Sequence, residues 1–138
     1  MRVLILFMCL FTVSTHASWW SSDYVHGISQ VEVETLAKLA DQGKVLFIDT
    51  REPEEHQEFH IPNSVNVALR DIADLDVSEM GTYDYVVPYC LKDFRGFEVA
   101  RHLKNKGLNN VVLMEPPGLN GWRSAGLPIS YYSGGAND

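Results

Sequence analysis

The side chains best placed to do chemistry are a cysteine and an arginine separated by four residues. Cys90 directly follows the apolar segment 85–89, and Arg95 lies near the start of a segment with helical periodicity. Backbone N–H groups and the positive end of a helix dipole favour a thiolate in such a position. Arg95 offers a fork of donors that can brace the loop or bind an anionic substrate oxygen. The pattern predicts a nucleophilic thiolate.

The residues around this pair form the predicted substrate-binding loop. Lys92 and Arg95 add positive charge near the sulfur, whereas the carboxylate of Asp93 opposes them. Phe94 places an apolar ring at the mouth of the site. The loop residues besides the catalytic pair are Leu91, Lys92, Asp93, Phe94 and Gly96.

Helices and short apolar runs alternate along the chain and must position this loop. We expect strands at 45–48, 65–67, 85–89 and 111–114, and helices near 33–40, 53–57, 72–75 and 94–106. Ser29 and Glu32 fit a capping box before the first helix. Strands separated by helical crossovers predict an α/β fold with a mainly parallel central sheet and helices on both faces.

Open sheets of this kind bind ligands at the carboxyl ends of their strands, which is where Cys90 lies. Asp49 and Arg51 follow the first strand at the same edge, so they are candidate supporting residues that hydrogen-bond the loop. They fit an ordinary turn and surface charge equally well. His56 and His60 have a zinc-binding spacing only on a helix, which Pro62 argues against, so no metal is expected.

The N-terminus predicts export. Arg2, the apolar run 3–13 and the small residues up to Ala17 resemble a signal peptide, with an uncleaved anchor or a buried N-terminal element as alternatives. We divide the chain into a signal peptide (1–17), a leader (18–27), a single domain (28–130) and a tail (131–138). Periplasmic or secreted localisation follows. Removal of the signal peptide would leave Cys90 as the only cysteine, so this residue is inert, paired with another molecule, or reactive.

Composition excludes several classes of protein. A hydrophobic fraction of 46% is typical of a globular domain and argues against disorder. A formal net charge of −7 with scattered acids is unlike a nucleic-acid or membrane-surface binder. We therefore expect no nucleic-acid partner, and no membrane contact beyond the signal peptide.

Three motifs resemble the single-domain rhodaneses. The family's active loop, Cys-x-x-Gly-x-Arg-Ser/Ala, corresponds to CLKDFRG at 90–96. Its Asp-x-Arg-Glu and Gly-His-Ile-Pro-Gly-Ala-x-Asn motifs correspond to DTRE at 49–52 and FHIPNSVN at 59–66. The later Gly-Gly-x-x-x-Trp and Gly-Leu-Pro motifs correspond to PGLNGW at 117–122 and GLP at 126–128. The resemblance covers residues 28–130 and implies a rhodanese-like fold.

The resemblance implies a sulfurtransferase that needs no cofactor. Cys90 would take the outer sulfur of thiosulfate or a similar donor, release sulfite and hold the sulfur as a persulfide. Cyanide or a thiol, a protein thiol included, would accept it. The related phosphatases place five residues between cysteine and arginine, whereas four separate Cys90 from Arg95, which suits a single sulfur better than a phosphate.

Departures from the family pattern keep a second reading open. Asp93 replaces a glycine, Gly96 replaces a serine or alanine, and Pro88 interrupts a strand that should be central. Because two of these changes fall in the loop, thiosulfate need not be the natural donor. The alternative is a catalytically weak rhodanese-like module that binds a protein partner or a small anion.

Overall fold

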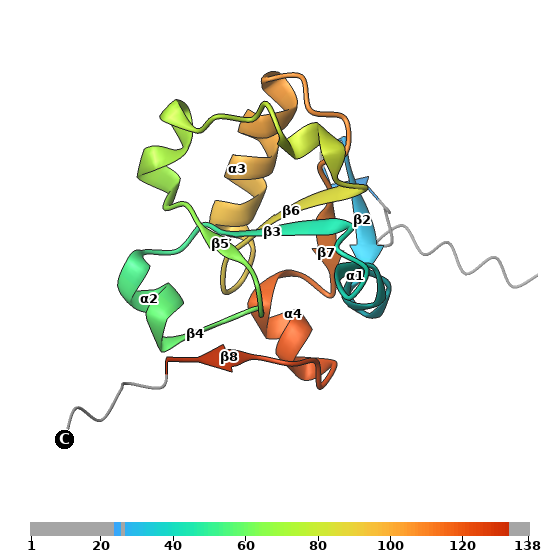
Figure 1. Ribbon diagram of the computed structural model, residues 1–138, viewed down its shortest axis with the longest axis vertical. Coiled ribbons are helices and arrows are strands. Elements are labelled where there is room, and N and C mark those ends of the chain that lie inside the picture. The colour runs from blue at the N-terminus through green and yellow to red at the C-terminus, as the bar shows by residue number, and fades with distance from the viewer. Residues whose placement is uncertain (1–23, 26, 133–138) are drawn as a thin grey trace, which may run out of the picture.

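The computed structural model describes residues 24, 25 and 27–132 (Figure 1). The predicted signal peptide, most of the leader and the end of the tail lie outside the described residues. Within the described ranges, no helix has both the length and the apolar character needed to cross a membrane.

Parallel pairing dominates the strands, as predicted. β3 (Val45–Asp49) lies between β5 (Val65–Asn66) and β6 (Tyr85–Tyr89) and is parallel to both. β2 (Ile28–Glu32) is parallel to β7 (Leu113–Glu115). A bridge between Val86 and Val111 joins the two groups. Two antiparallel pairs lie at the periphery: β1 (Tyr24–Val25) with β2, and β4 (Phe59–His60) with β8 (Ser130–Tyr131).

Helices cover both faces of this sheet, because successive strand residues point to opposite sides. Ile48 and Val86 join an apolar cluster with α3 and a 3₁₀ segment, whereas Phe47 and Val87 join a second cluster with α1 and α4. The helices are α1 (Val33–Ala40), α2 (Pro53–Glu58), α3 (Phe94–Asn105) and α4 (Gly118–Ser124), with 3₁₀ segments η1 (Leu69–Asp74) and η2 (Met80–Thr82).

The structure corrects some local predictions. The capping box at Ser29 and Glu32 is wrong, because Ser29 lies inside β2 and Glu32 precedes α1 without a side-chain cap. The box occurs instead at Glu52 and Glu55, at the start of α2. The predicted strand 111–114 begins only at Leu113. The sequence analysis also missed α4, because its glycines indicate turns.

Candidate functional site

The loop that carries Cys90 is fixed between β6 and α4. Cys90 follows β6 directly, and its carbonyl accepts a hydrogen bond from the N–H of Leu119 at 2.8 Å. The carbonyl of Leu91 accepts one from Asn120 at 3.1 Å. Gly118, with φ +67°, begins α4 here, and a Cβ on it would lie 2.8 Å from the Cys90 carbonyl oxygen. Backbone contacts from the start of α4 therefore fix the loop, and they are close enough to require a glycine at position 118.

The Cys90 side chain is only 4% exposed. Within the described part of the chain, no backbone N–H donates a hydrogen bond to its sulfur, although the sequence predicted that the loop amides converge there. The carbonyl of the preceding residue, Tyr89, is held by the N–H and the hydroxyl of Thr50, at 2.8 and 2.9 Å. Thr50 was missed by the sequence analysis, although it lies between the two residues singled out there. Because Cys90 is nearly buried, a sulfur donor must enter the loop to reach the sulfur.

Arg95 links this loop to α2. Its two terminal nitrogens donate to the Glu55 carboxylate, at 2.6 and 2.9 Å. Donation to the Glu55 carboxylate raises the pKa of Arg95, and the nearby Cys90 side chain adds to the effect. The same hydrogen bond lowers the pKa of Glu55. The Glu55 carboxylate therefore fixes the guanidinium, close enough to Cys90 for that side chain to affect its pKa.

Glu55 is a site residue that the sequence analysis missed. It lies 40 residues before Arg95, and its carboxylate also accepts the N–H of Glu52 at 3.0 Å. The capping-box spacing of Glu52 and Glu55, after the end of a strand, was the available signal. Such a signal indicates a helix start but does not show that the carboxylate also binds Arg95.

Asp49 and Arg51 form a buried ion pair beside the site. Both are almost fully buried, and the guanidinium donates to the carboxylate at 2.7 to 3.2 Å. His56 Nδ1 and the Tyr89 hydroxyl also contact the Asp49 carboxylate, at 2.9 and 3.3 Å. The sequence also fitted an ordinary turn with surface charge, and the burial of both residues excludes that alternative. The described contacts join the pair to α2 and β4, and not to the loop 90–96. A supporting role in catalysis stays a prediction.

Asp93 and Gly96 fit each other inside the loop. Asp93 has φ +75° at the N-cap of α3 and is 8% exposed. A Cβ on Gly96 would lie 2.3 Å from Asp93 Oδ1 and 2.9 Å from the Tyr89 Cα. The Asp93 carboxyl therefore occupies space that a larger residue at position 96 needs. The two loop departures from the family pattern compensate each other in volume.

Gly96→Ala should lower the free energy of unfolding by about 1–3 kcal/mol, because the added methyl overpacks a closed space. Urea unfolding checks this, with Gly81→Ala as the control, since a Cβ at Gly81 meets nothing within 4 Å. Removing the carboxyl as well, in Asp93→Gly/Gly96→Ala, should destabilise less than the sum of the single changes. A neutral Gly96→Ala variant would contradict the close contact.

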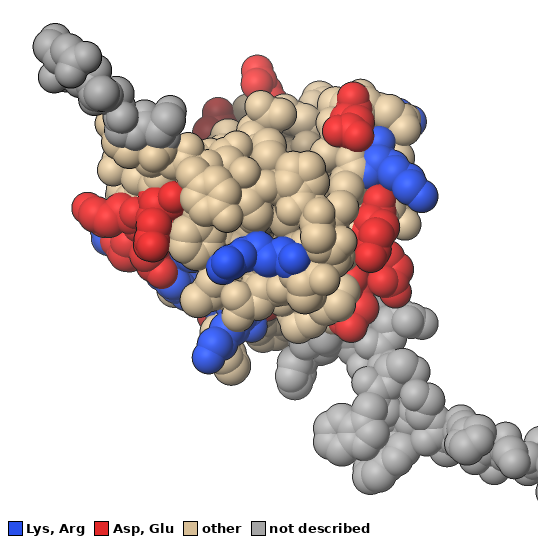
Figure 2. All heavy atoms as spheres, turned by 90° about the horizontal axis from the view of Figure 1, so that it is seen from below, with Lys and Arg blue, Asp and Glu red and all other residues tan. Residues whose placement is uncertain are grey.

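The mouth of the loop is exposed and apolar. The Phe94 side chain is 81% exposed, and Lys92 beside it is also exposed. Figure 2 views the molecule from the side of α4 and β8. Basic side chains cross the middle of this face, and acidic groups lie to both sides of them. Because the Phe94 ring is so exposed, it is available to a donor, an acceptor or a partner protein.

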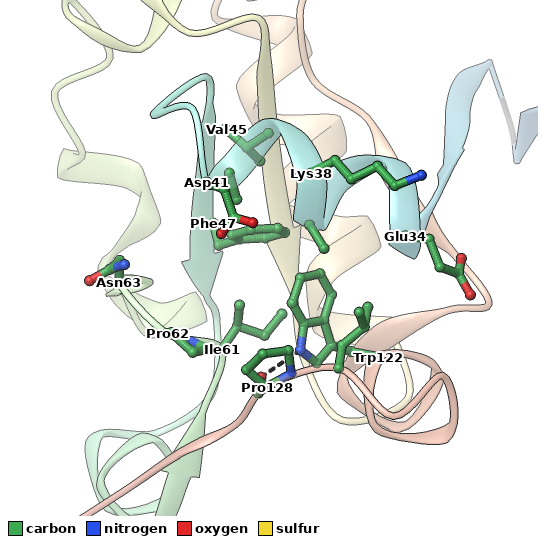
Figure 3. Close-up of a pocket in the computed structure, with 13 residues that line it drawn as sticks. Glu34, Lys38, Asp41, Val45, Phe47, Ile61, Pro62, Asn63, Trp122 and Pro128 are labelled. Carbon is green, nitrogen blue, oxygen red and sulfur yellow. Dashed lines mark hydrogen bonds between the residues drawn. The ribbon is translucent and has the colours of Figure 1, made fainter.

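A separate cavity of about 640 Å³ lies on the α1 side of the sheet (Figure 3). Phe47, Ile61 and Trp122 line it, together with residues of α1, and none of the loop residues 90–96 does so. Trp122 is buried, and its indole N–H donates to the Pro128 carbonyl at 2.8 Å. Trp122 thus belongs to the core and the wall of this cavity, and not to the loop.

The two histidines considered as zinc ligands stack on each other. Their ring centroids are 4.0 Å apart, with His56 in α2 and His60 in β4. His56 contacts the Asp49 carboxylate, and His60 Nδ1 contacts the His56 carbonyl oxygen at 2.8 Å. The described residues contain no group of three or more side chains suited to hold a metal ion.

Comparison with known proteins places the chain in a family. The Rhodanese-like domain family matches residues 32–125. A sulfurtransferase of Allochromatium vinosum is 28% identical over 74% of this chain and 94% of its own length. The thiosulfate:glutathione sulfurtransferase of Saccharomyces cerevisiae is 29% identical over 76% of this chain and 85% of its own.

Comparison of the structure with solved structures gives the same fold. The thiosulfate sulfurtransferase of Pseudomonas aeruginosa superimposes with a TM-score of 0.64 at 24% identity, over 75% of this chain and 20% of that one. Several other curated relatives are longer, and this chain spans 31 to 55% of three of them. With the family match covering most of its length, the chain belongs to the rhodanese-like domain family.

Proposed function

We propose that the protein is a sulfurtransferase that carries sulfur as a persulfide on Cys90. The observation that carries the proposal is the position of Cys90 at the carboxyl end of β6, beside the guanidinium of Arg95. Relatives named as sulfurtransferases support sulfur transfer at the level of the family. The donor, the acceptor and the residue roles are our inference from the site.

The reaction divides into two displacements at sulfur. The Cys90 thiolate attacks the outer sulfur of a donor such as thiosulfate, and the S–S bond of the donor breaks with its electron pair leaving on sulfite. Cys90 then holds a persulfide anion. An acceptor, cyanide or a thiolate, attacks the outer sulfur of this persulfide, and the Cys90 thiolate leaves. No net oxidation and no cofactor is required.

Two groups of the protein can stabilise the negative charge on sulfur in both steps. Arg95 brings a full positive charge whose position Glu55 fixes by two hydrogen bonds. The N-terminus of α3 adds the positive end of a helix dipole. Preorganised charges of this kind stabilise a transition state without rearranging during the reaction.

A catalytically weak binding module remains the second candidate. The nearly buried sulfur and the carboxyl group of Asp93 within the loop favour it, because both oppose the approach of an anionic donor. The exposed ring of Phe94 would then contact a partner. We also propose export to the periplasm or the outside of the cell, from the N-terminal signal.

Thiocyanate formation tests the sulfurtransferase proposal. The purified protein should convert cyanide to thiocyanate with a sulfane-sulfur donor, and double-reciprocal plots should give the parallel lines of a ping-pong reaction. Thiosulfate and an organic thiosulfonate are both to be tried as donors. No thiocyanate with either donor, from a folded protein, would favour the binding module.

Arg95→Ala should lower kcat/KM by about 100-fold while the protein stays folded, because a preorganised positive charge beside the reacting sulfur is lost. Arg101→Ala is the matched control, since Arg101 lies on the same helix but pairs with exposed Glu98. Steady-state kinetics of both variants checks this. Equal rates for Arg95→Ala and the wild type would show that Arg95 serves the fold alone.

A further inference from the structure

We propose that Asp93 is the donor-specificity residue of the loop: its carboxylate disfavours doubly charged sulfur donors and selects donors with at most one negative charge. This inference rests on the proposed function and names the class of donor for the same site. Organic thiosulfonates and small persulfides belong to that class, whereas thiosulfate is a dianion.

The geometry places the carboxyl inside the loop and leaves it without a cation. Asp93 is the N-cap residue of α3, three residues after Cys90, and it is nine-tenths buried. Its Oδ1 has no hydrogen-bond partner in the described part of the chain. Arg95, the nearest guanidinium in the sequence, directs both terminal nitrogens to Glu55 instead. A negative charge on Asp93 is therefore not neutralised by an ion pair.

Among the described residues, the surroundings of Asp93 contain no cation that forms an ion pair with its carboxylate, so the charge of this group can change with pH. Asp93 Oδ1 lies against Gly96, beside the backbone of Pro88 and Tyr89, and the Cys90 backbone donates a hydrogen bond to the carboxylate. The titratable or charged side chains nearest in the sequence are Cys90, exposed Lys92 and Arg95, and Arg95 pairs with Glu55 of α2. The start of α4 brings Gly118 against the Asp93 N–H, and its next residues, Leu119 and Asn120, carry no titratable group.

Burial also decides when this charge is present. Desolvation raises the pKa of Asp93 from 3.8 to about 7, and a hydrogen bond from the Cys90 backbone opposes the rise. The carboxyl is therefore neutral below pH 7 and becomes negative as the pH rises through 7. The carboxyl is mostly neutral at pH 6 and mostly ionised at pH 8, so an anion that approaches Cys90 meets more negative charge at pH 8. The low-dielectric surroundings of the loop strengthen the repulsion.

Alkylation of Cys90 measures this charge without any sulfur transfer. Iodoacetate is an anion and iodoacetamide is neutral, and both consume the thiolate, so the ratio of their rate constants cancels the thiolate fraction. In the wild type we expect the iodoacetate to iodoacetamide ratio to fall by about 10-fold between pH 6 and pH 8. In Asp93→Asn, which keeps the shape and tolerates positive φ, the ratio should stay constant.

Glu98→Gln is the matched control, because Glu98 is an exposed acid on the same helix. This variant should show the same fall as the wild type. A fall that persists in Asp93→Asn, or a constant ratio in the wild type, would overturn the assignment, since another group or none would then set the charge.

Donor kinetics at pH 8 closes the test. The ratio of kcat/KM for thiosulfate, a dianion, to that for benzenethiosulfonate, a monoanion, should rise by about 10-fold in Asp93→Asn. Transfer from both donors with an unchanged ratio would overturn the role of Asp93 and leave the sulfurtransferase intact. Absence of transfer from either donor, in both proteins, would overturn the proposed function, while the alkylation ratio still reports the charge.

Discussion

Cys90→Ser should abolish sulfur transfer and leave the fold intact. A serine hydroxyl is a far weaker nucleophile and cannot hold a sulfur atom as a persulfide, so thiocyanate formation should fall to the uncatalysed rate. The change is nearly isosteric, and the backbone carbonyl of this residue keeps its hydrogen bond from the Leu119 N–H. Steady-state assays with circular dichroism check both parts.

The outcome separates the two functions considered for this site. An enzyme loses all activity in Cys90→Ser, whereas a binding module has none to lose and keeps its partner. Turnover in Cys90→Ser at a rate near that of the wild type would mean that the sulfur never passes through Cys90.

Arg51→Met should lower the free energy of unfolding by about 3–5 kcal/mol, because it leaves the Asp49 carboxylate buried without its cation. The guanidinium also donates to the Phe59 carbonyl and lies 5.1 Å from the centre of the Phe59 ring, so a second contact is lost. Chemical denaturation at neutral pH measures the change.

Arg70→Met is the control for this variant. Arg70 pairs with Glu52, but both side chains are largely exposed, and exposed pairs contribute at most about 1 kcal/mol. A loss for Arg51→Met that is no larger than the loss for Arg70→Met would show that the ion pair with Asp49 does not hold β3, α2 and β4 together.

The surroundings of Cys90 were predictable because local signals there agree. The apolar run 85–89 has the bounds of β6, and the following periodic segment differs from α3 by one residue at its end. Parallel pairing of β3 with β5 and β6 follows from the helical crossovers between them. The strand–loop–helix unit therefore needed no long-range information.

Tertiary contacts explain what was missed. Gly118 and Gly121 discourage a helix on propensity alone, yet α4 needs them, because a Cβ at Gly121 would lie 2.1 Å from the Pro116 carbonyl oxygen. Glu55 meets Arg95 across 40 residues of sequence, and the burial of Asp49 with Arg51 depends on Tyr89 and His56. Contacts between segments so far apart leave no periodic pattern in a single sequence.

The mass of the protein after incubation with a sulfane-sulfur donor tests the central claim most directly. Intact-mass spectrometry of the wild type should show the gain of one sulfur atom, peptide mapping should place it on the peptide that contains Cys90, and a reducing thiol should remove it. An unchanged mass with both thiosulfate and benzenethiosulfonate, in a protein whose Cys90 still reacts with iodoacetamide, would contradict the account.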